Sequence, residues 1–499
     1  MDIVSNLMVG FAAAATAQNL FFCLAGCLLG TLVGVLPGIG PVATIAMLLP
    51  ATYGLAPLTS LIMLAGIYYG AQYGGSTTAI IVNIPGEVSS VVTVLDGHQM
   101  ARQGRAGVAL GIAAIGSFIA GTLATVMIAA LGVPLARFAL VFGPTDYFAL
   151  MVFGLMFAVV LARGSLLKAV AMILAGVLLS TVGTDLETGQ PRLTFGRAEL
   201  FDGIEFAVLA MGVFGFAEIV RTLEEKQSRS LSEAPIGRLL PSLDDMKAAI
   251  APILRGTVIG GLLGLLPGNG AVLGPFAAYA TEKRLSRHPQ RFGKGAIEGV
   301  AGPESANNAG AQTAFLPLLT LGIPPNAVMA LMVGAMTIHG IVPGPQIITK
   351  QPELFWGMVV SMWIGNLMLL VINLPLVGLW VRLIKAPYRL LFPAIVLFCC
   401  IGIYSINNSA AEVAEVAIFG LLGYVLLKLD FEPAPLVLGF VLGRLLEEKF
   451  RQSLLISGGD LHTFADHPIS ATLLVLTALI VLIALLPVIR RKREQVFTE

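Results

Sequence analysis

A run of twenty residues without a charge, from 470 to 489, constrains the fold of this chain more than any other feature. At about 1.5 Å per residue, a helix of this length spans the roughly 30 Å hydrocarbon core of a bilayer. Similar apolar stretches recur along the 499 residues, and only 12% of the residues are charged, whereas soluble domains carry about 25%. So few charges cannot cover a water-facing surface. We therefore predict an all-α polytopic membrane protein and exclude a disordered, secreted or nucleic-acid-binding protein.

The basic residues predict how the chain is oriented in the membrane. Four consecutive basic residues, Arg490 to Arg493, directly follow the last apolar run, so the positive-inside rule places the C-terminus in the cytoplasm. The longest polar stretch, 221–247, is predicted to be a cytoplasmic linker between two halves of similar length. Lys449 and Arg451 fit this assignment poorly. No basic segment precedes the first apolar stretch, which argues against a cleaved signal peptide.

Two short motifs occur twice, which indicates an internal duplication. Gly-Val-Leu-Pro-Gly-Ile-Gly at 34–40 matches Gly-Leu-Leu-Pro-Gly-Asn-Gly at 264–270, and Asn-Ile-Pro-Gly at 83–86 matches Gly-Ile-Pro-Pro at 322–325. A chance match of Gly/Pro-rich pieces is the alternative. A basic loop follows the second Leu-Pro-Gly motif but not the first. After the Ile-Pro motifs, the more basic loop instead follows the first motif. Equivalent loops then lie on opposite sides of the membrane, which predicts the inverted repeat of many secondary transporters.

The duplication predicts the domain boundaries. Only 33 residues, 248–280, lie between two loops that both look cytoplasmic, fewer than the about 40 needed for two crossings. We therefore expect a re-entrant hairpin there and about 11 to 14 membrane segments in total, some of them broken. The predicted units are a first half at 1–220 (transport elements 20–105, scaffold helices 106–220), the linker at 221–247, a second half at 248–450 (transport elements 250–345, scaffold helices 354–450), and a C-terminal helix with a basic tail at 451–499.

The motif turns carry the candidate substrate-binding groups. Half-helix N-termini offer unpaired N–H groups and partial positive charge to a carboxylate, and amide or hydroxyl side chains are too costly to face lipid. Kinking or close helix packing is the alternative for the glycines, and bonding to the residue's own helix is the alternative for Ser and Thr. The candidates are Gly38, Gly40, Gly75, Ser76, Thr77, Asn83, Pro85, Gly86, Gly268, Asn269, Gly270, Ser305, Asn307, Asn308, Pro324 and Asn326.

The candidate groups for cation coupling lie beside these turns. Unwound carbonyls and helix C-termini suit Na⁺, and the rare acidic residues Glu87 and Glu304 are each either a cation or proton site or an interfacial anchor. We expect a transported Na⁺ or H⁺ but no resident metal or cofactor. The coupling candidates are Gly74, Thr78, Glu304 and Asn308.

Enzyme signatures are absent from the sequence. It contains neither a Gly-x-x-x-x-Gly-Lys-Ser/Thr phosphate loop nor a His-Glu-x-x-His helix, so ATP hydrolysis and zinc-dependent catalysis are not expected. Two other functions have less support from the sequence: a membrane enzyme that acts on a lipid carrier, and a purely structural membrane scaffold. The four cysteines are predicted to be small core residues.

These motifs together resemble the TctA family, the large membrane subunit of the tripartite tricarboxylate transporters. The resemblance runs from about residue 20 to about residue 450, and its motifs are specific as a set although each alone is weak. One departure is Pro325, where the family pattern has Gly, so a backbone N–H is lost from the second turn. The matching stretches are Gly34–Pro41, Tyr73–Thr78, Asn83–Gly86, Phe142–Pro144, Gly183–Asp185 to Thr194–Gly196, Glu304–Asn308, Leu321–Pro324, and His339–Ile341 to Pro345.

The resemblance implies a three-component importer in a bacterial inner membrane. This chain would form the translocation path, with a small TctB-like membrane subunit and a periplasmic TctC-like solute-binding protein as partners. Uptake would be driven by an Na⁺ or H⁺ gradient instead of ATP, with citrate-like tricarboxylates, dicarboxylates or aromatic acids as substrates. An elevator-type movement of the transport elements is expected from this resemblance. The alternative function is a carboxylate channel or facilitator without coupling.

Overall fold

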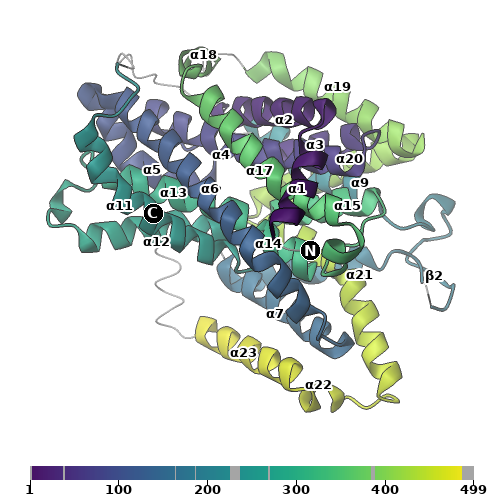
Figure 1. Cartoon of the computed structure of the whole chain (residues 1–499). Helices are drawn as coiled ribbons and strands as arrows, with labels where there is room; N and C mark the ends of the chain where they lie inside the picture. Colours follow the sequence, from purple (N-terminus) through teal and green to yellow (C-terminus); the bar gives the residue numbers. More distant parts are fainter. Residues whose placement is uncertain are drawn as a thin grey trace.

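The computed structural model describes residues 3–36, 40–162, 165–185, 187–224, 237–267, 270–383 and 388–485. Helices make up most of this part of the chain (Figure 1). Eight of the described helices are long and apolar enough to cross a membrane, and three more are apolar but shorter. The prediction of an all-α polytopic membrane protein is therefore confirmed.

The helices of the first half include several short 3₁₀ and π segments, labelled η. Their bounds are α1 (Ile3–Ala14), α2 (Ala17–Val35), α3 (Pro41–Leu48), η1 (Pro50–Thr52), α4 (Pro57–Val82), η2 (Val88–Ser90), α5 (Val91–Thr93), η3 (Val94–His98), η4 (Ala101–Arg105), α6 (Ala106–Ala139), α7 (Pro144–Leu161), α8 (Leu166–Ser180), η5 (Ala198–Leu200), α9 (Phe206–Ala210), η6 (Met211–Phe216) and α10 (Ala217–Glu224).

The helices of the second half follow the polar segment. Their bounds are α11 (Leu243–Gly264), α12 (Gly270–Leu285), η7 (Pro289–Arg291), α13 (Glu298–Thr313), α14 (Phe315–Leu321), α15 (Ala327–Ile338), α16 (Gln346–Lys350), α17 (Pro352–Asn373), α18 (Val377–Leu383), α19 (Tyr388–Asn407), α20 (Ala410–Lys428), α21 (Pro433–Ile456), α22 (Thr463–Asp466) and α23 (Pro468–Leu485).

Two helix pairs, α2 with α4 and α11 with α13, pack with the same register. Three glycines of α2 press against carbonyl groups of α4, three glycines of α11 press against α13, and a Cβ at any of the six would overlap the carbonyl oxygen. The equivalent contacts are separated by 230 residues on the first helix of each pair and by 239 on the second, which are the offsets of the sequence motifs. The inverted orientation and the domain boundaries remain predictions. The contacts are Gly26 with Met63, Gly30 with Ile67, Gly34 with Ala71, Gly256 with Gly302, Gly260 with Ala306, and Gly264 with Gly310.

Both central pairs lead into a helix break of the same form. Asn83 ends α4 with φ 62°, and Gly322 ends α14 with φ 74°. This left-handed conformation is open to Gly and, among other residues, most readily to Asn or Asp. Four residues further on, Glu87 and Asn326 are both extended, and each is the N-cap of the next helix. The two breaks therefore end and restart helices at equivalent positions.

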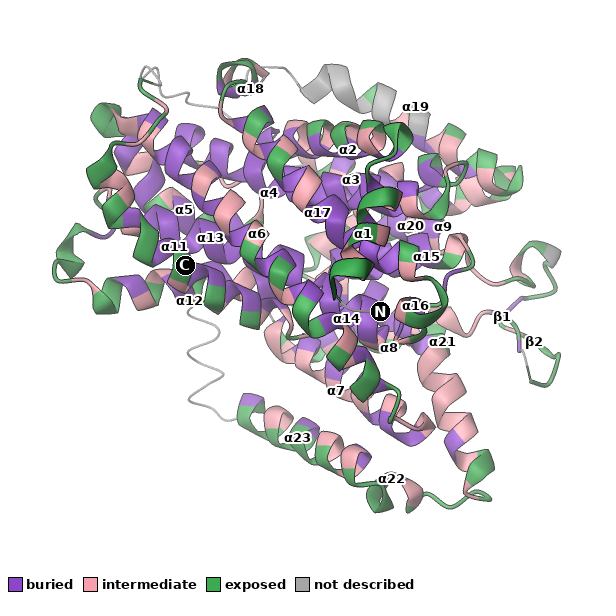
Figure 2. Ribbon diagram, in the orientation of Figure 1, coloured by how far each residue is buried: buried purple, intermediate pink, exposed green. Residues whose placement is uncertain are grey.

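The helices that lead into the breaks are buried, and so are residues 322–326 of the second break, whereas Asn83 of the first break is exposed. From Thr59 onward every residue of α4 is buried, and so is every residue of α13 after the first. The outer helices α20 and α23 instead expose apolar faces (Figure 2), as expected for helices in contact with lipid or another membrane subunit.

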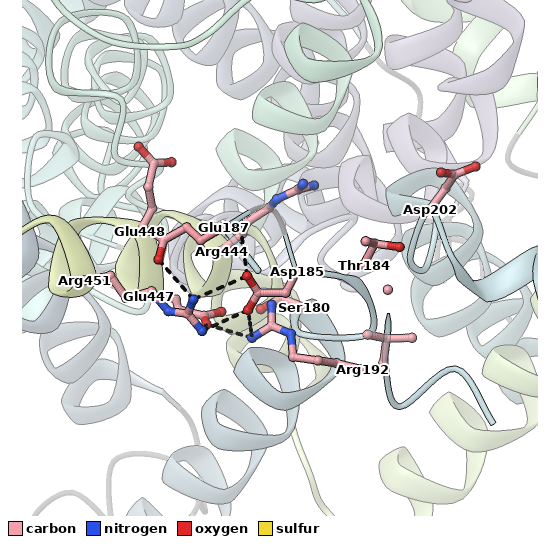
Figure 3. A pocket seen from close by; sticks show the side chains of 12 residues that line it. Ser180, Thr184, Asp185, Glu187, Arg192, Asp202, Arg444, Glu447, Glu448 and Arg451 are labelled. Atoms are coloured by element: carbon pink, nitrogen blue, oxygen red, sulfur yellow. Dashed lines mark hydrogen bonds and ion pairs between the residues drawn. The ribbon is translucent and has the colours of Figure 1, made fainter. Parts of the chain in front are cut away.

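A small hairpin projects from the helical body, and the sequence did not predict it. Its strands are β1 (Gly183–Thr184) and β2 (Pro191–Arg192), which pair antiparallel. Arg451 of α21 holds the hairpin through ion pairs to Asp185 at 3.0 Å and Glu187 at 3.2 Å (Figure 3). The backbone N–H groups of Thr188 and Glu187 lower the pKa of Asp185 to about 2, with Arg451 adding to the effect.

These ion pairs explain why two basic residues disagreed with the predicted topology. Arg451 also pairs with Glu447 at 2.6 Å, and Lys449 pairs with Glu448 at 3.1 Å. The positive-inside rule concerns basic residues in short loops near the ends of membrane helices. Arg451 and Lys449 instead lie within α21 and are neutralised by carboxylates, so they carry little information about the side of the membrane.

Candidate functional site

A cavity of about 330 Å³ lies between the two helix breaks. Both halves of the chain contribute to its wall, as does α21 from the predicted scaffold. Its volume lies in the range of small-molecule sites. The lining residues are Gly40, Pro41, Val42, Tyr68, Gln72, Glu87, Val88, Ser89, Phe214, Glu218, Ala271, Val272, Asn307, Asn326, Ala327, Val328, Glu432, Pro433 and Ala434.

Four helices of eight or more residues begin at this cavity. The first residues of α3, α12, α15 and α21 all belong to its wall or directly precede a wall residue. The short η2 also begins there, with Glu87 as its N-cap. A helix N-terminus carries unpaired N–H groups and about half a positive charge, so it attracts anions. Convergence of four such ends gives the cavity a positive backbone potential that does not depend on basic side chains.

The side chains that line the cavity are acidic, amide or apolar. Three carboxylates, Glu87, Glu218 and Glu432, belong to the wall, and none of the described lining residues is Lys or Arg. Arg221, which lies outside the wall, is 3.8 Å from Glu218. Asn307 Nδ2 donates a hydrogen bond of 3.1 Å to Glu87 Oε1 and thus joins the two halves at the cavity.

A second polar cluster surrounds Glu304 inside the central helix α13. The hydroxyl groups of Ser76 and Thr93, both from the first half, donate hydrogen bonds to the two carboxylate oxygens of Glu304. The Glu304 side chain is completely buried, and no ion pair found among the described residues involves it. A buried carboxylate without a basic partner is costly unless it binds a proton or a cation. Glu304 therefore has the surroundings expected of a cation or proton site.

Asn308 and Ser305 are the other candidate polar residues of the same helix. Asn308 Nδ2 donates to Ser117 Oγ at 2.6 Å and to the carbonyl oxygen of Glu304 at 3.1 Å. Ser305 Oγ is buried and has no hydrogen-bond partner among the described residues. Neither side chain lines the cavity. Asn308 therefore contacts the Glu304 cluster, whereas Ser305 contacts neither group of residues through a hydrogen bond.

The candidate glycines Gly74 of α4 and Gly86 of the first break bring backbones together. A Cβ on Gly74 would overlap the carbonyl oxygen of Thr31, and one on Gly86 would overlap Gly34 and Gly75. Thr78 Oγ1 donates to the carbonyl oxygen of Val35 at 2.9 Å. These contacts fix α4 against α2 and the first break, beside the cavity and not in its wall.

The structure places the remaining predicted residues in three groups. Gly40, Asn307 and Asn326 line the cavity, and Gly270 starts α12 immediately before the lining residues Ala271 and Val272. Ser76 and Thr77 line a separate small space of about 10 Å³, Asn83 is exposed, Pro85 is half-buried and Pro324 is buried in the second break. Gly38, Gly268 and Asn269 lie outside the described residues.

Sequence reasoning missed part of the wall. Tyr68, Gln72 and Ser89 come from the first half, and Ser89 Oγ donates to Gln72 Oε1 at 3.2 Å. The start of α21 was also missed, although an acidic residue before Pro433 is a recognisable helix-start signal. In the described part of the chain, no group of three or more His, Cys, Asp or Glu residues could hold a metal ion.

Comparison with known proteins identifies the family. The family described as "Tripartite tricarboxylate transporter TctA family" matches residues 20–438. A relative from Agrobacterium vitis, named "Uncharacterized 52.8 kDa protein in TAR-I ttuC' 3'region", is 58% identical over 499 residues, covering 100% of this chain and 99% of the relative. A second protein of that organism, "Uncharacterized protein in TAR-II ttuC' 3'region", is 61% identical over 240 residues, covering 48% of this chain and 99% of its own length.

No solved structure gives a significant match. TctA is a family of transporters and not of enzymes, and its members belong to systems of several subunits. The family match covers the two breaks and the start of α21, which form the cavity, and it also covers the Glu304 cluster. This chain is therefore a multi-pass membrane protein that belongs to the TctA family of tripartite tricarboxylate transporters.

Proposed function

We propose that this chain imports small carboxylates by symport with Na⁺ or H⁺ and that the 330 Å³ cavity is its substrate site. The observation that carries the proposal is the convergence of four helix N-termini on one cavity between two equivalent breaks. Backbone N–H groups at helix starts bind carboxylates without basic side chains. Asn307 and Asn326 add amide groups beside them.

The charge of the cavity favours coupled transport over simple passage. Each helix N-terminus contributes about 0.3–1 kcal/mol to anion binding, so four contribute roughly 1–4 kcal/mol. One like-charge pair 4 Å apart costs about 4 kcal/mol at an effective dielectric constant of 20. Because three carboxylates line the cavity, a di- or tricarboxylate gains little unless it enters with cations or protons. This balance supports symport.

Glu304 is the proposed coupling group. Its carboxylate has hydroxyl donors from the first half and lies on the same helix as Asn307, one turn from the cavity wall. Helical residues three apart share one region of the helix surface, so a cation or proton at Glu304 would sit near the bound substrate. Gly74 and Thr78 support this cluster through the packing of α4, and Asn308 bonds to the Glu304 carbonyl group.

The remaining parts of the proposal follow from the family and the sequence. The partners are a small TctB-like membrane subunit and a periplasmic TctC-like binding protein, and the membrane is the bacterial inner membrane with the C-terminus in the cytoplasm. An elevator-type movement of the elements at 20–105 and 250–345 would carry the cavity across the bilayer. The substrates are citrate-like tricarboxylates, dicarboxylates or aromatic acids.

Uptake by reconstituted protein tests this proposal. Proteoliposomes that contain this chain with its small subunit, supplied with the binding protein, should accumulate radiolabelled citrate, succinate or benzoate when an inward Na⁺ or H⁺ gradient is imposed. Accumulation should stop when the gradient is collapsed with an ionophore. Saturable uptake that never exceeds equilibrium would support the uncoupled facilitator, and no uptake of any of the three acids would contradict the proposed substrate class.

A further inference from the structure

A second cavity, of about 250 Å³, lies apart from the substrate cavity. It is formed by the end of α8, the segment after the hairpin, the last turns of α15 and the middle of α21. It shares no residue with the 330 Å³ cavity. Its wall includes Asp202, Glu205, Phe206, Thr337, Phe440 and Arg444.

Three packed elements connect the two cavities. The start of α15 lines the first cavity and its end lines the second, and α21 runs in the same way from Ala434 to Phe440. The α9–η6 segment runs in the opposite direction, from Phe206 at the second cavity to Phe214 at the first. The three elements pack against one another (Figure 1). Ala434 and Phe440 are six residues apart along α21, a rise of roughly 9 Å.

An apolar layer fills the space between the cavities. Leu209 of α9, Ala330 of α15 and Val437 of α21 belong to one hydrophobic cluster, and each has 0% of its surface exposed. These residues offer no polar side chain that could bind an anion between the cavities. The two cavities are therefore separate compartments along one line of helices in this conformation.

Arg444 is the basic group of the second cavity. Among the described lining residues it is the only Lys or Arg. Its neighbours Arg192 and Arg451 each form ion pairs with Asp185 and Glu447, whereas no ion pair found among the described residues involves Arg444. Figure 3 shows its guanidinium group apart from those of the two paired arginines. An exposed, unpaired guanidinium can bind a carboxylate through two parallel hydrogen bonds.

Two acidic residues also line this cavity and oppose the positive charge of Arg444. Asp202 and Glu205 lie in the segment that leads from the hairpin into α9. Burial raises the pKa of Glu205, and the nearby Glu412 raises it further. The hydroxyl group of Thr337 also belongs to the wall and offers a neutral donor beside Arg444.

The topology places the second cavity toward the outer face. If the basic tail after α23 is cytoplasmic, the single apolar helix α23 puts the 457–467 loop on the other side of the membrane. The end of α21, which leads into this loop, and the hairpin that it holds then lie on that outer side. The first cavity, at the opposite end of α21, lies nearer the cytoplasm.

We propose that this second cavity is an outer binding site for the substrate carboxylate, with Arg444 as the group that holds it before it passes the apolar layer. The inference rests on the proposed function for the identity of the ligand. It adds an anion site that none of the repeated sequence motifs contains. It also predicts that Arg444 sets the substrate concentration needed for uptake more strongly than the maximal rate.

Cysteine labelling tests the site directly. Arg444→Cys and the control Lys449→Cys are prepared with the four native cysteines replaced by Ser. Lys449 lies on the same helix and is basic, but it pairs with Glu448 and Gln452 and does not line the cavity. In purified protein, citrate should slow the labelling of the cysteine at position 444 by a methanethiosulfonate at least about threefold more than sodium sulfate of equal ionic strength. Citrate is used at least about tenfold above the KM of the unsubstituted protein, which offsets the affinity lost with Arg444. Labelling at position 449 should be unaffected by citrate.

Uptake then shows whether the positive charge matters. Loss of a charged hydrogen-bonding partner should raise the KM of the Arg444→Cys protein by about 10-fold or more. A positively charged reagent should restore the KM, and a negatively charged one should not. Equal protection of both cysteines, or a KM equal to that of the Lys449→Cys protein, overturns the inference. Protection at position 444 without uptake by the unsubstituted protein supports this site while contradicting the proposed symport, so the two failures are distinguishable.

Discussion

Replacement of Asn307 by Leu is the sharpest test of the substrate cavity. The side chain lines the cavity, and its Nδ2 donates a 3.1 Å hydrogen bond to Glu87 Oε1. Leu has a similar volume but no donor, so it removes one amide from the substrate and one hydrogen bond from the Glu87 carboxylate. The loss of a buried partner costs about 1–3 kcal/mol. If the substrate-bound state is destabilised by this free energy, the KM for uptake should rise between about 5-fold and about 150-fold.

The matched control for this change is Asn373→Leu. Asn373 is also buried in a membrane helix and bonds to Thr31 Oγ1 at 3.4 Å and to the Leu369 carbonyl oxygen at 2.9 Å, but it does not line the cavity. Both proteins are compared by radiolabelled uptake in proteoliposomes at equal reconstituted amounts. A KM for Asn307→Leu within twofold of the unsubstituted protein, or equal to that of the control, would refute the assignment of the cavity as the substrate site.

Three further predictions concern the coupling group, the helix packing and the hairpin. Glu304→Gln should make uptake independent of the imposed cation gradient, whereas Glu298→Gln at the start of the same helix should leave that dependence intact. Gly260→Ala should destabilise the protein by about 1–3 kcal/mol because its Cβ would overlap a carbonyl oxygen. Thermal unfolding should show no such loss for Gly261→Ala, whose nearest neighbour is a flexible methionine sulfur at 3.3 Å. Asp185→Asn should increase hydrogen exchange in the hairpin at neutral pH. In the unsubstituted protein that protection should persist above about pH 4 and weaken as the pH falls toward 2, because a carboxylate with a lowered pKa stabilises the fold only while ionised.

The sequence predicted an internal duplication but not which helix faces point at the cavity. The offsets of 230 and 239 residues in the motifs recur in the glycine contacts of both helix pairs, since close packing depends on residue type at fixed spacing. Ser76, however, points to Glu304 and not into the cavity wall. Because α4 is buried on all sides, its sequence has no polar face to mark its orientation.

The sequence did not predict, for a different reason, that the scaffold helix α21 contributes to the cavity wall. Pro433 and Ala434 reach the cavity from a helix more than 100 residues after Asn326. A helix start can be recognised locally, but the distant group that it faces depends on the packing of all intervening helices. The same holds for Thr93, whose bond to Glu304 joins segments 211 residues apart.

The convergence of helix starts has a practical consequence for mutagenesis of this protein. Ala271, Ala327 and Ala434 already carry the smallest side chain with a Cβ, so an alanine scan cannot interrogate them, and their N–H groups survive every replacement except proline. The informative substitutions are additions of bulk. Ala434→Val or Ala327→Val would add two methyl groups to the cavity wall. Uptake of a series of acids of increasing length would then show the size at which each variant no longer transports its substrate.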